Sequence, residues 1–269
     1  MKNPKVDQLP TKHIGRRLLL YDRVESTNSL ALELARDPTN DGVAVLANEQ
    51  TAGRGRYGRN WHCPPGAGVL LSLVVFAPAH VRRPVLLTAW AATTVAEVIR
   101  NMSGLVARLK WPNDVLVGGK KVCGILIEHG TATVVGIGLN VNQTADDLGA
   151  MELTDASSLF LCSGRRYDVS QIARTLIQAL DASYDQIQRA ALNDLESRWQ
   201  GYLDLSNREV VVTYHEAVSR GRVRKLGWEA LELESPKGGL VQIRPESITK
   251  LHVVESEELG ETRCADEER

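Results

Sequence analysis

The spacing of hydrophobic and polar positions changes several times along the chain, and each change predicts an element. Short apolar runs bounded by turn residues predict β-strands at 43–47, 69–76, 105–109 and 133–142. A Gly118-Gly119 turn joins two further apolar runs, 115–117 and 122–128, into a predicted hairpin. Gly136 and Gly138 lie inside the last strand, where glycine usually marks close approach by a ligand or another backbone.

Three segments have the period and the end signals of α-helices. Ser26 is an N-cap candidate for a helix that continues to Ala35. Pro84 opens a second helix, which stops before Gly104. The third is a long amphipathic helix whose apolar residues recur every three to four positions, at Ile172, Leu176, Leu180, Tyr184 and Ile187. We expect these five side chains to lie in the core.

The pattern divides the chain into a large part and a small part, as its 269 residues allow. From Asn207 onward the strands become short and closely spaced, which predicts a small β-barrel. These strands are expected at 210–213, 222–224, 230–233 and 240–243. Residues 1–19 are polar and basic, and we expect a partly mobile lead-in there. Residues 256–269 are predicted to be an acidic, disordered tail. The fold class expected is α+β.

Composition narrows the choice of partners and compartment. The formal net charge is −1, so no basic excess neutralises phosphates, and a nucleic-acid partner is not expected. No apolar run approaches the roughly 18 residues of a membrane span, so we expect no membrane partner. The start lacks the apolar core of a signal peptide. The cysteines at 63, 123, 162 and 264 have neither C-x-x-C nor metal-ligand spacing. We therefore expect a cytoplasmic protein with reduced thiols and no metal site.

Residues 53–61, here called the arginine loop, carry the strongest chemical signal. The sequence GRGRYGRNW sets three arginines among three glycines and ends on Trp61. Its glycines match G-x-G-x-x-G, but the Pro64-Pro65-Gly66 that follows cannot open the helix a dinucleotide-binding turn needs. Arginine forks suit carboxylate and phosphate, and glycine lets a backbone approach a ligand closely. An anion-binding loop is favoured over the alternative, a solvated basic turn.

Lys110 begins a second constellation, KWPND, at the end of the run 105–109. Pro112 forbids a helix there, and the Asn-Asp pair that follows supplies turn chemistry. A lysine in this place could serve as a point charge for phosphate. Taken alone, a solvated lysine at a strand end is the simpler interpretation.

Taken together, the two motifs closely resemble the biotin protein ligase family, over about residues 20 to 255. Three further segments follow the family's order: Ser26-Thr27-Asn28 with Gln50, KVCGILIE at 121–128, and GIGLNVN at 136–142. The resemblance implies a class II synthetase/biotin ligase-like catalytic domain at 20–205, a mixed sheet with flanking helices. It also implies an SH3-like module at 206–255.

The resemblance implies a two-step reaction with ATP, biotin and Mg²⁺. Biotin is activated as biotinyl-5′-AMP, and a specific lysine of a biotin carboxyl carrier domain then takes the biotin. Lys110 and Arg56 are the expected catalytic residues. Residues expected to bind biotin are Ser26, Thr27, Asn28, Gln50, Arg54, Gly55, Arg56, Lys110 and Gly124. Residues expected to bind the nucleotide are Arg56, Arg59, Trp61, Lys110, Asn113, Lys121 and Asn140.

Some of these residues have structural alternatives. Ser26 could cap its helix, and Trp61 and Trp111 could pack in the core. Pairing through a sheet edge leaves a homodimer open. Cys123 stands where the family commonly has alanine, a small apolar change that we expect to be tolerated. The stretch 244–248 departs from the family's small-residue turn, which puts an ATP contact by Lys250 in doubt.

Three other functions stand as alternatives to biotin ligation. About 20 residues precede the catalytic motifs, against the roughly 60 of a repressor-type winged helix, so transcriptional repression is not expected. A lipoate–protein ligase would share the fold and the adenylation, but the arginine loop matches the biotin class. A non-catalytic binding module would hold a ligand without releasing pyrophosphate. The presence of both Arg56 and Lys110 argues against that module.

Overall fold

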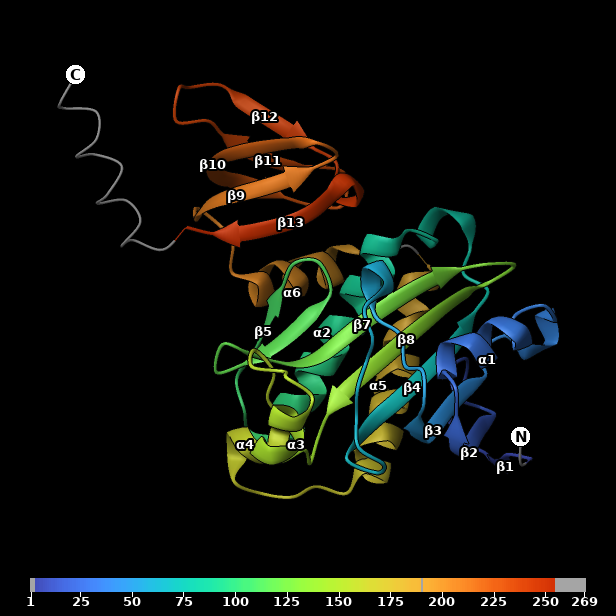
Figure 1. Ribbon diagram of the computed structural model, residues 1–269. Helices are drawn as coiled ribbons and strands as arrows, with labels where there is room; N and C mark the ends of the chain where they lie inside the picture. Colours follow the sequence, from blue (N-terminus) through green and yellow to red (C-terminus); the bar gives the residue numbers. More distant parts are fainter. Residues whose placement is uncertain (1–2, 190, 255–269) are drawn as a thin grey trace. The chain divides into compact units, whose positions relative to one another are not determined.

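The computed structural model describes residues 3–189 and 191–254, which form two compact units that divide between Tyr202 and Leu203 (Figure 1). The first unit is built on a mixed sheet in the order β1-β2-β3-β4-β8-β7-β6-β5. Only β2 and β3 are parallel among its described strand pairs. The strands are β1 (Lys5–Asp7), β2 (Leu18–Val24), β3 (Ala44–Gln50), β4 (Gly68–Val75), β5 (Ala107–Lys110), β6 (Asp114–Val117), β7 (Lys120–His129) and β8 (Thr133–Asn140).

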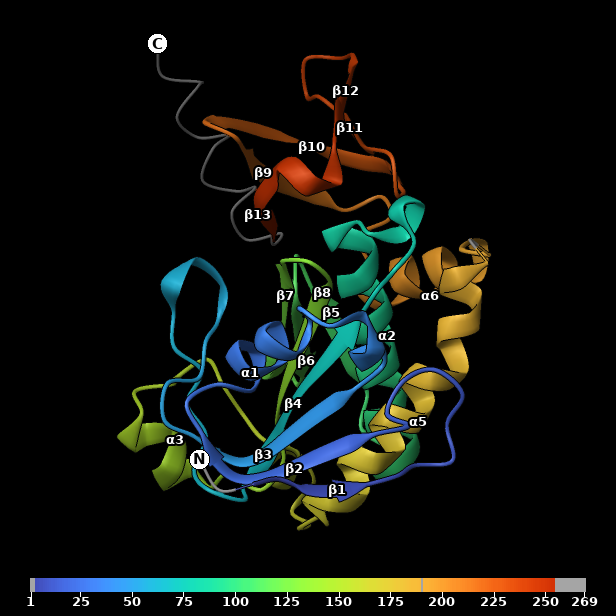
Figure 2. The ribbon, with the colours of Figure 1, turned by 90° about the vertical axis from the view of Figure 1, so that its right-hand side faces the viewer.

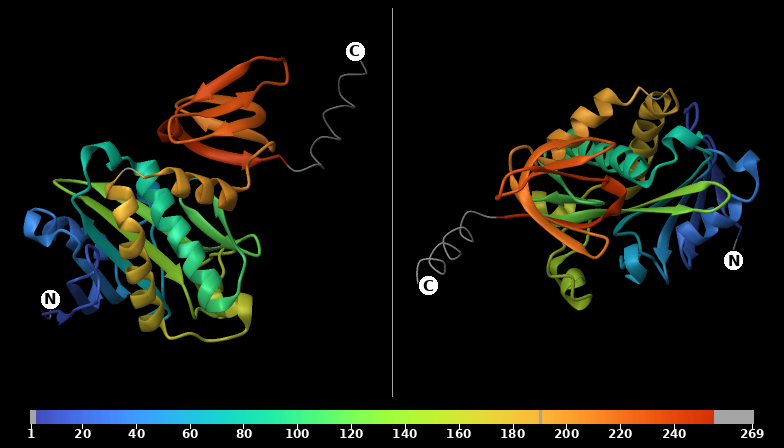
Figure 3. Two further views of the ribbon diagram at one scale, coloured as in Figure 1. Left: turned by 180° about the vertical axis from the view of Figure 1, so that it is seen from behind. Right: turned by 90° about the horizontal axis from the view of Figure 1, so that it is seen from above.

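Helices cover the two faces of this sheet unequally. The long helices α2 (Pro84–Ser103) and α5 (Val169–Gln188) pack against each other and against one face, as Figures 2 and 3 show. The short helix α1 (Thr27–Leu34) packs on β3, β4 and β8 from the opposite face. The remaining helices are α3 (Ala145–Ala150), α4 (Leu159–Ser163) and α6 (Asn193–Leu203). The short helix α1 therefore covers only part of its face of the sheet, and the loops that follow β3 and β5 can reach the rest.

The expected helices and strands of the first unit are confirmed. Ser26 is the N-cap of α1 and accepts a hydrogen bond from the backbone of Ser29. Gly104 ends α2 in the left-handed conformation, with φ 74°, which costs glycine no Cβ clash. The five apolar residues predicted for the third helix are all buried on α5. The predicted α+β fold with a mixed sheet and flanking helices is also confirmed.

The expectation of a partly mobile lead-in over residues 1–19 is wrong for its described part, 3–19. Residues 5–7 form β1, and Ile14 and Leu18 are fully buried. The Asp181 carboxylate on α5 accepts the backbone N–H groups of Lys12, His13 and Ile14 at 2.6 to 2.8 Å. The local sequence does not predict this order, because the carboxylate that accepts the backbone N–H groups belongs to Asp181, about 170 positions away in the chain.

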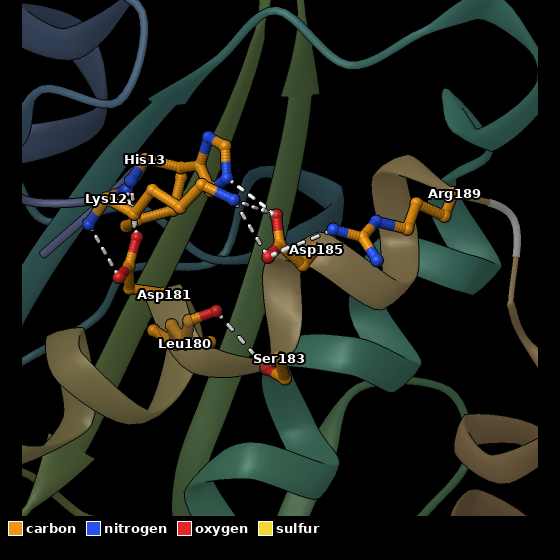
Figure 4. A network of polar contacts seen from close by, with 8 residues as sticks. Lys12, His13, Leu180, Asp181, Ser183, Asp185 and Arg189 are labelled. Carbon is orange, nitrogen blue, oxygen red and sulfur yellow. Dashed lines mark hydrogen bonds and ion pairs between the residues drawn. The ribbon is translucent and has the colours of Figure 1, made fainter.

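A neighbouring carboxylate on α5 strengthens the same attachment (Figure 4). Asp185 accepts hydrogen bonds from Lys12 Nζ at 3.0 Å and faces His13 Nε2 at 2.7 Å. Hydrogen bonds from Lys12 and His13 hold the pKa of Asp185 below its ordinary value. The N-terminal segment is thereby tied to α5 by both backbone and side chains.

The second unit is a five-stranded antiparallel sheet in the order β12-β11-β10-β9-β13. Its strands are β9 (Glu209–Tyr214), β10 (Ala217–Leu226), β11 (Leu231–Glu234), β12 (Leu240–Ile243) and β13 (Ile248–Val253). The expected β module is confirmed as a sheet, whereas its SH3-like class stays a prediction. β13 was not expected, because Thr249, Lys250 and His252 break up its apolar pattern. The predicted acidic tail lies outside the described residues.

Candidate active site

The face that carries α1 has a floor of three glycines in the middle of the sheet. Gly136 and Gly138 are two apart on β8 and so point to one face. Gly124 on β7 lies directly opposite Gly138. Because these residues have no side chains, groups from outside the sheet can approach its backbone at this place.

Trp61, at the end of the arginine loop, lies on this floor. A Cβ at Gly138 would stand 2.4 Å from the indole ring, and one at Gly124 would stand 3.1 Å from it. The Lys121 amine lies over the same ring, 5.7 Å from its centroid. The close approach expected at Gly138 is thus made by a half-buried tryptophan side chain, Trp61.

Asn28 fills the neighbouring place on the floor. A Cβ at Gly136 would lie 2.2 Å from Asn28 Oδ1, so only glycine leaves room for this amide. Ser72, opposite Gly136 on β4, donates a hydrogen bond to Asn28 Oδ1. Asn28 Nδ2 donates to Glu128 Oε2 at 2.7 Å. Hydrogen bonds at both Oδ1 and Nδ2 therefore fix the orientation of the Asn28 amide.

Thr27 and Gln50 extend this polar cluster at the start of α1. The backbone N–H and the hydroxyl of Thr27 both donate to Gln50 Oε1, at 2.6 and 2.9 Å. This leaves the Nε2 donors of Gln50 available for another partner. Ser26, Thr27 and Asn28 are all buried, and the Ser26 hydroxyl serves the helix cap.

The arginine loop folds back on itself as a narrow hairpin that crosses β7 and β8 (Figure 1). Gly55 N–H donates to the Arg59 carbonyl at 2.7 Å, and Trp61 N–H donates to the Gly53 carbonyl at 2.9 Å. At its tip Tyr57 and Gly58 have positive φ values of 57° and 73°. For Tyr57 this left-handed conformation carries a cost that Gly58 avoids.

Arg54 of the loop reaches β7, whereas Arg56 reaches the turn between β5 and β6. Arg54 Nη2 pairs with Glu128 Oε2 on β7 at 2.9 Å. Arg56 reaches Asn113 Oδ1 at 3.4 Å and Tyr57 Oη at 3.0 Å, and its guanidinium lies 4.9 Å from the Tyr57 ring centroid. The Asn113 amide donates in turn to the Ile125 carbonyl at 2.8 Å.

Lys110 lies at the end of β5 in a row of residues that crosses four strands. It stands opposite Asp114 on β6, which stands opposite Gly124, which stands opposite Gly138. Directly opposed residues of antiparallel strands share a face, so Lys110 belongs to the face of the glycine floor. Among residues 3–189 and 191–254, neither exposed Lys110 nor exposed Arg59 has an ion-pair partner.

Asn140 is also brought to this end of the sheet, but its amide is committed internally. Its Nδ2 donates to the Ser157 carbonyl at 2.9 Å, and its Oδ1 accepts from Gln143 Nε2 at 3.0 Å. Gln143 Nε2 also approaches Cys63 Sγ at 3.2 Å. Burial raises the pKa of the Cys63 thiol to about 12.

Several residues of this arrangement were not singled out from the sequence. Ser72 and Gln143 lie in runs that read as ordinary strand and loop. Glu128 ends the KVCGILIE segment and was given no separate role. Trp111 does follow its packing alternative, because it is buried with its ring centroid 5.7 Å from that of Trp199. Cys123 is fully buried, and burial raises the pKa of its thiol.

Within the described residues there is no group of three or more His, Cys, Asp or Glu side chains placed to hold a metal ion. No helix in the described ranges is both long and apolar enough to cross a membrane.

The fold of the chain is that of the biotin protein ligases. The biotin protein ligase from Aquifex aeolicus in complex with biotin and ATP superposes with a TM-score of 0.76 at 24% identity, over 88% of this chain and 99% of that one. Residues 20–142 match the biotin/lipoate A/B protein ligase family. This match assigns residues 20–142 of the chain to the family.

Two relatives extend the comparison. The chain is 34% identical to the bifunctional ligase/repressor BirA of Bacillus subtilis, over 72% of this chain and 62% of that protein. It is 36% identical to the biotin–[acetyl-CoA-carboxylase] ligase of Mycobacterium tuberculosis, over 65% of this chain and 66% of that protein. The chain thus spans a little under two thirds of the length of these relatives.

Proposed function

We propose that the chain is an ATP-dependent biotin ligase, which activates biotin as biotinyl-5′-AMP and transfers it to a lysine of a biotin carboxyl carrier domain. The observation that carries this proposal is the cationic edge of the glycine floor. Lys110 shares the face of Gly124 and Gly138, and the arginine loop lies over that face. The family and the biotin and ATP named for the Aquifex aeolicus complex support this proposal.

The first step joins two anions, the biotin carboxylate and the α-phosphate of ATP. A carboxylate oxygen attacks the α-phosphorus, the bond to the bridging oxygen breaks, and pyrophosphate leaves. Lys110, Arg56 and Arg59 would lower the repulsion and stabilise the charge that develops. The exposed charges of Lys110 and Arg59 suit this role, because within residues 3–189 and 191–254 no carboxylate pairs with either of them. Mg²⁺ would arrive bound to the nucleotide phosphates, as part of the substrate.

Recognition of biotin would fall to the polar cluster at the start of α1. A ureido group needs both donors and acceptors, which Ser26, Thr27, Asn28 and Gln50 offer. Gln50 has its oxygen occupied by Thr27, so its amide N–H groups remain to donate. Arg54 and Gly55 would close the loop over the ligand, and the bare backbone at Gly124 would leave room for it.

The nucleotide would lie on the other side of the loop, near Trp61, Lys121, Asn113 and Asn140. Trp61 offers an aromatic face from its position over the floor. Asn140 would act by supporting the floor, since its own amide is committed to Ser157 and Gln143.

In the second step the lysine amine of the carrier attacks the carbonyl carbon of the mixed anhydride. An amide bond forms, and AMP leaves with the bonding electrons. The loop would retain the adenylate and exclude water until the carrier arrives. We assign both steps to residues 20–205 and propose that residues 206–255 form an SH3-like module.

The test is pyrophosphate release by the purified chain with ATP and Mg²⁺, and with either biotin or lipoate. Release with biotin alone is expected. Release with lipoate alone would move the chain to lipoate ligation, and ligand binding without release would favour the non-catalytic module.

A further inference from the structure

We infer that Glu128 is a positioning residue that ties the arginine loop to Asn28. This inference rests on the proposed function, since Asn28 and Arg54 are the groups proposed to hold biotin and to close over it. Glu128 lies near the end of β7, where its carboxylate is half-buried.

A single carboxylate oxygen joins the two parts of the site. Glu128 Oε2 accepts from Asn28 Nδ2 at 2.7 Å and from Arg54 Nη2 at 2.9 Å. The donors come from positions 100 and 74 residues away in the chain, on α1 and on the loop. Hydrogen bonds to an ionised group are the stronger kind, so this oxygen is an effective point of attachment.

The same contact orients the Asn28 amide. A carboxylate only accepts, so it must face Nδ2, while Ser72 donates to Oδ1 from the other side. Glycine at 136 lets the amide sit directly against the sheet. Replacing the carboxylate by an amide removes the charge and allows the Asn28 amide to turn over.

The consequence is a coupling between ligand recognition and loop position. While Arg54 is held by Glu128, the loop stays over the floor and Asn28 presents one fixed pattern of donor and acceptor. When the loop leaves, Glu128 loses its cationic partner. Glu128 reaches the reaction only through Arg54 and Asn28, so its removal should weaken biotin binding and loop closure rather than the chemical step.

The first arm of the test needs no ligand. Hydrogen–deuterium exchange is measured on peptides that cover the loop in wild type, Glu128→Gln and a control, Glu97→Gln. Glu97 on α2 makes a comparable half-buried pair with Arg198 at 2.8 Å, outside the site. Exchange at the amides of Gly55 and Trp61 should become about tenfold faster in Glu128→Gln and stay unchanged in Glu97→Gln.

The second arm measures biotin-dependent exchange of pyrophosphate into ATP. Glu128→Gln should raise the biotin KM about tenfold and leave kcat within about twofold of wild type, because it removes charged hydrogen bonds to groups that hold the ligand. Arg54→Gln should behave similarly. The double variant should lose little more than Glu128→Gln alone, because Glu128→Gln already removes the charged contact to Arg54.

The outcomes separate this inference from the function on which it rests. Unchanged loop exchange in Glu128→Gln would overturn the attachment, whatever the kinetics show. A fall in kcat with unchanged biotin KM, or additive effects in the double variant, would overturn the positioning role. If wild type shows no biotin-dependent exchange, the proposed function fails, and the ligand-free arm alone still supports or overturns the attachment of the loop.

Discussion

Asp114 forms an ion pair with Lys121 and not with Lys110, although the sequence predicts both lysines for the same site. Its carboxylate pairs with Lys121 Nζ at 2.7 Å, while Lys110 stands directly opposite it across β5 and β6 without an ion pair among the described residues. Lys121 is therefore partly neutralised within the protein. Lys110 keeps its charge for a ligand, which makes it the stronger candidate for the chemical step.

Removing the charge at Lys110 should slow adenylation far more than removing the charge at Lys121. Lys110→Ala is expected to lower pyrophosphate release at saturating substrate by about a hundredfold or more, through loss of an electrostatic stabiliser. Lys110→Arg should recover part of the rate. Lys120→Ala is the control, because Lys120 is exposed and lies beside Lys121 at the start of β7. Equal losses for Lys110→Ala and Lys121→Ala would contradict the separation of roles.

The glycine at 138 should be needed for the position of Trp61. In Gly138→Ala the new Cβ would overlap the indole ring at 2.4 Å, so Trp61 must move and the loop with it. We expect the KM for ATP to rise about tenfold in pyrophosphate exchange. Gly149→Ala, where nothing lies within 4 Å, is the matched control. An unchanged KM for ATP would show that Trp61 does not serve the nucleotide.

The arginine loop should retain the reactive intermediate. Arg56→Gly removes the contacts to Asn113 and Tyr57 and should let biotinyl-5′-AMP escape. The expected result is biotin on lysines of an unrelated bystander protein, detected by streptavidin blot. Labelling that stays on the carrier domain in this variant would contradict a retaining role for Arg56.

The attachment of the N-terminal segment should contribute to stability. Asp181→Ala leaves three backbone N–H groups without their acceptor, and we expect a loss of about 2 kcal/mol in the free energy of unfolding. Asp181→Asn keeps one acceptor oxygen and should lose less. Urea unfolding of the three proteins measures the difference. Equal stability of wild type and Asp181→Ala would show that the segment is not held there.

Cys63 should be unreactive in the folded protein. Its pKa is raised to about 12 by burial, so the thiolate fraction at pH 8 is on the order of one in ten thousand. Alkylation by iodoacetamide should be slow at pH 8, faster as the pH rises toward 12, and fast at pH 8 in denaturant. Peptide mass spectrometry follows the site. Labelling of native Cys63 at the rate of a free thiol would contradict the raised pKa of this half-buried side chain.

The sequence was most informative where the chemistry lies in one continuous segment. The arginine loop could be interpreted as an anion-binding loop from its glycines and arginines and from the prolines that follow it, whereas Lys110 gained its expected role only from the family resemblance. The glycines at 136 and 138 were correctly expected to admit a close approach. The approaching groups in this structure, Asn28 and Trp61, come from distant segments and could not be inferred from spacing.

The sequence was least informative where pairing between distant segments decides the geometry. The row from Lys110 to Gly138 depends on the register of three strand pairs, which no local pattern fixes. In the sequence Glu128 is only the end of a predicted strand, and its role becomes visible when folding brings Asn28 of α1 and Arg54 of the loop to it. The attachment of residues 3–19 could not be predicted for the same reason, because the acceptor of their backbone N–H groups, Asp181, lies far away in the sequence on α5.

The most direct test of the central claim is the mass of a biotin carboxyl carrier domain after incubation with the chain, ATP and Mg²⁺. With biotin present, we predict the mass increase of one biotinyl group on the acceptor lysine, and no increase on a carrier whose lysine is replaced by arginine. With Lys110→Ala the increase should be delayed by about a hundredfold or more. A carrier that keeps its mass with biotin, or that gains a lipoyl group instead, would contradict the account.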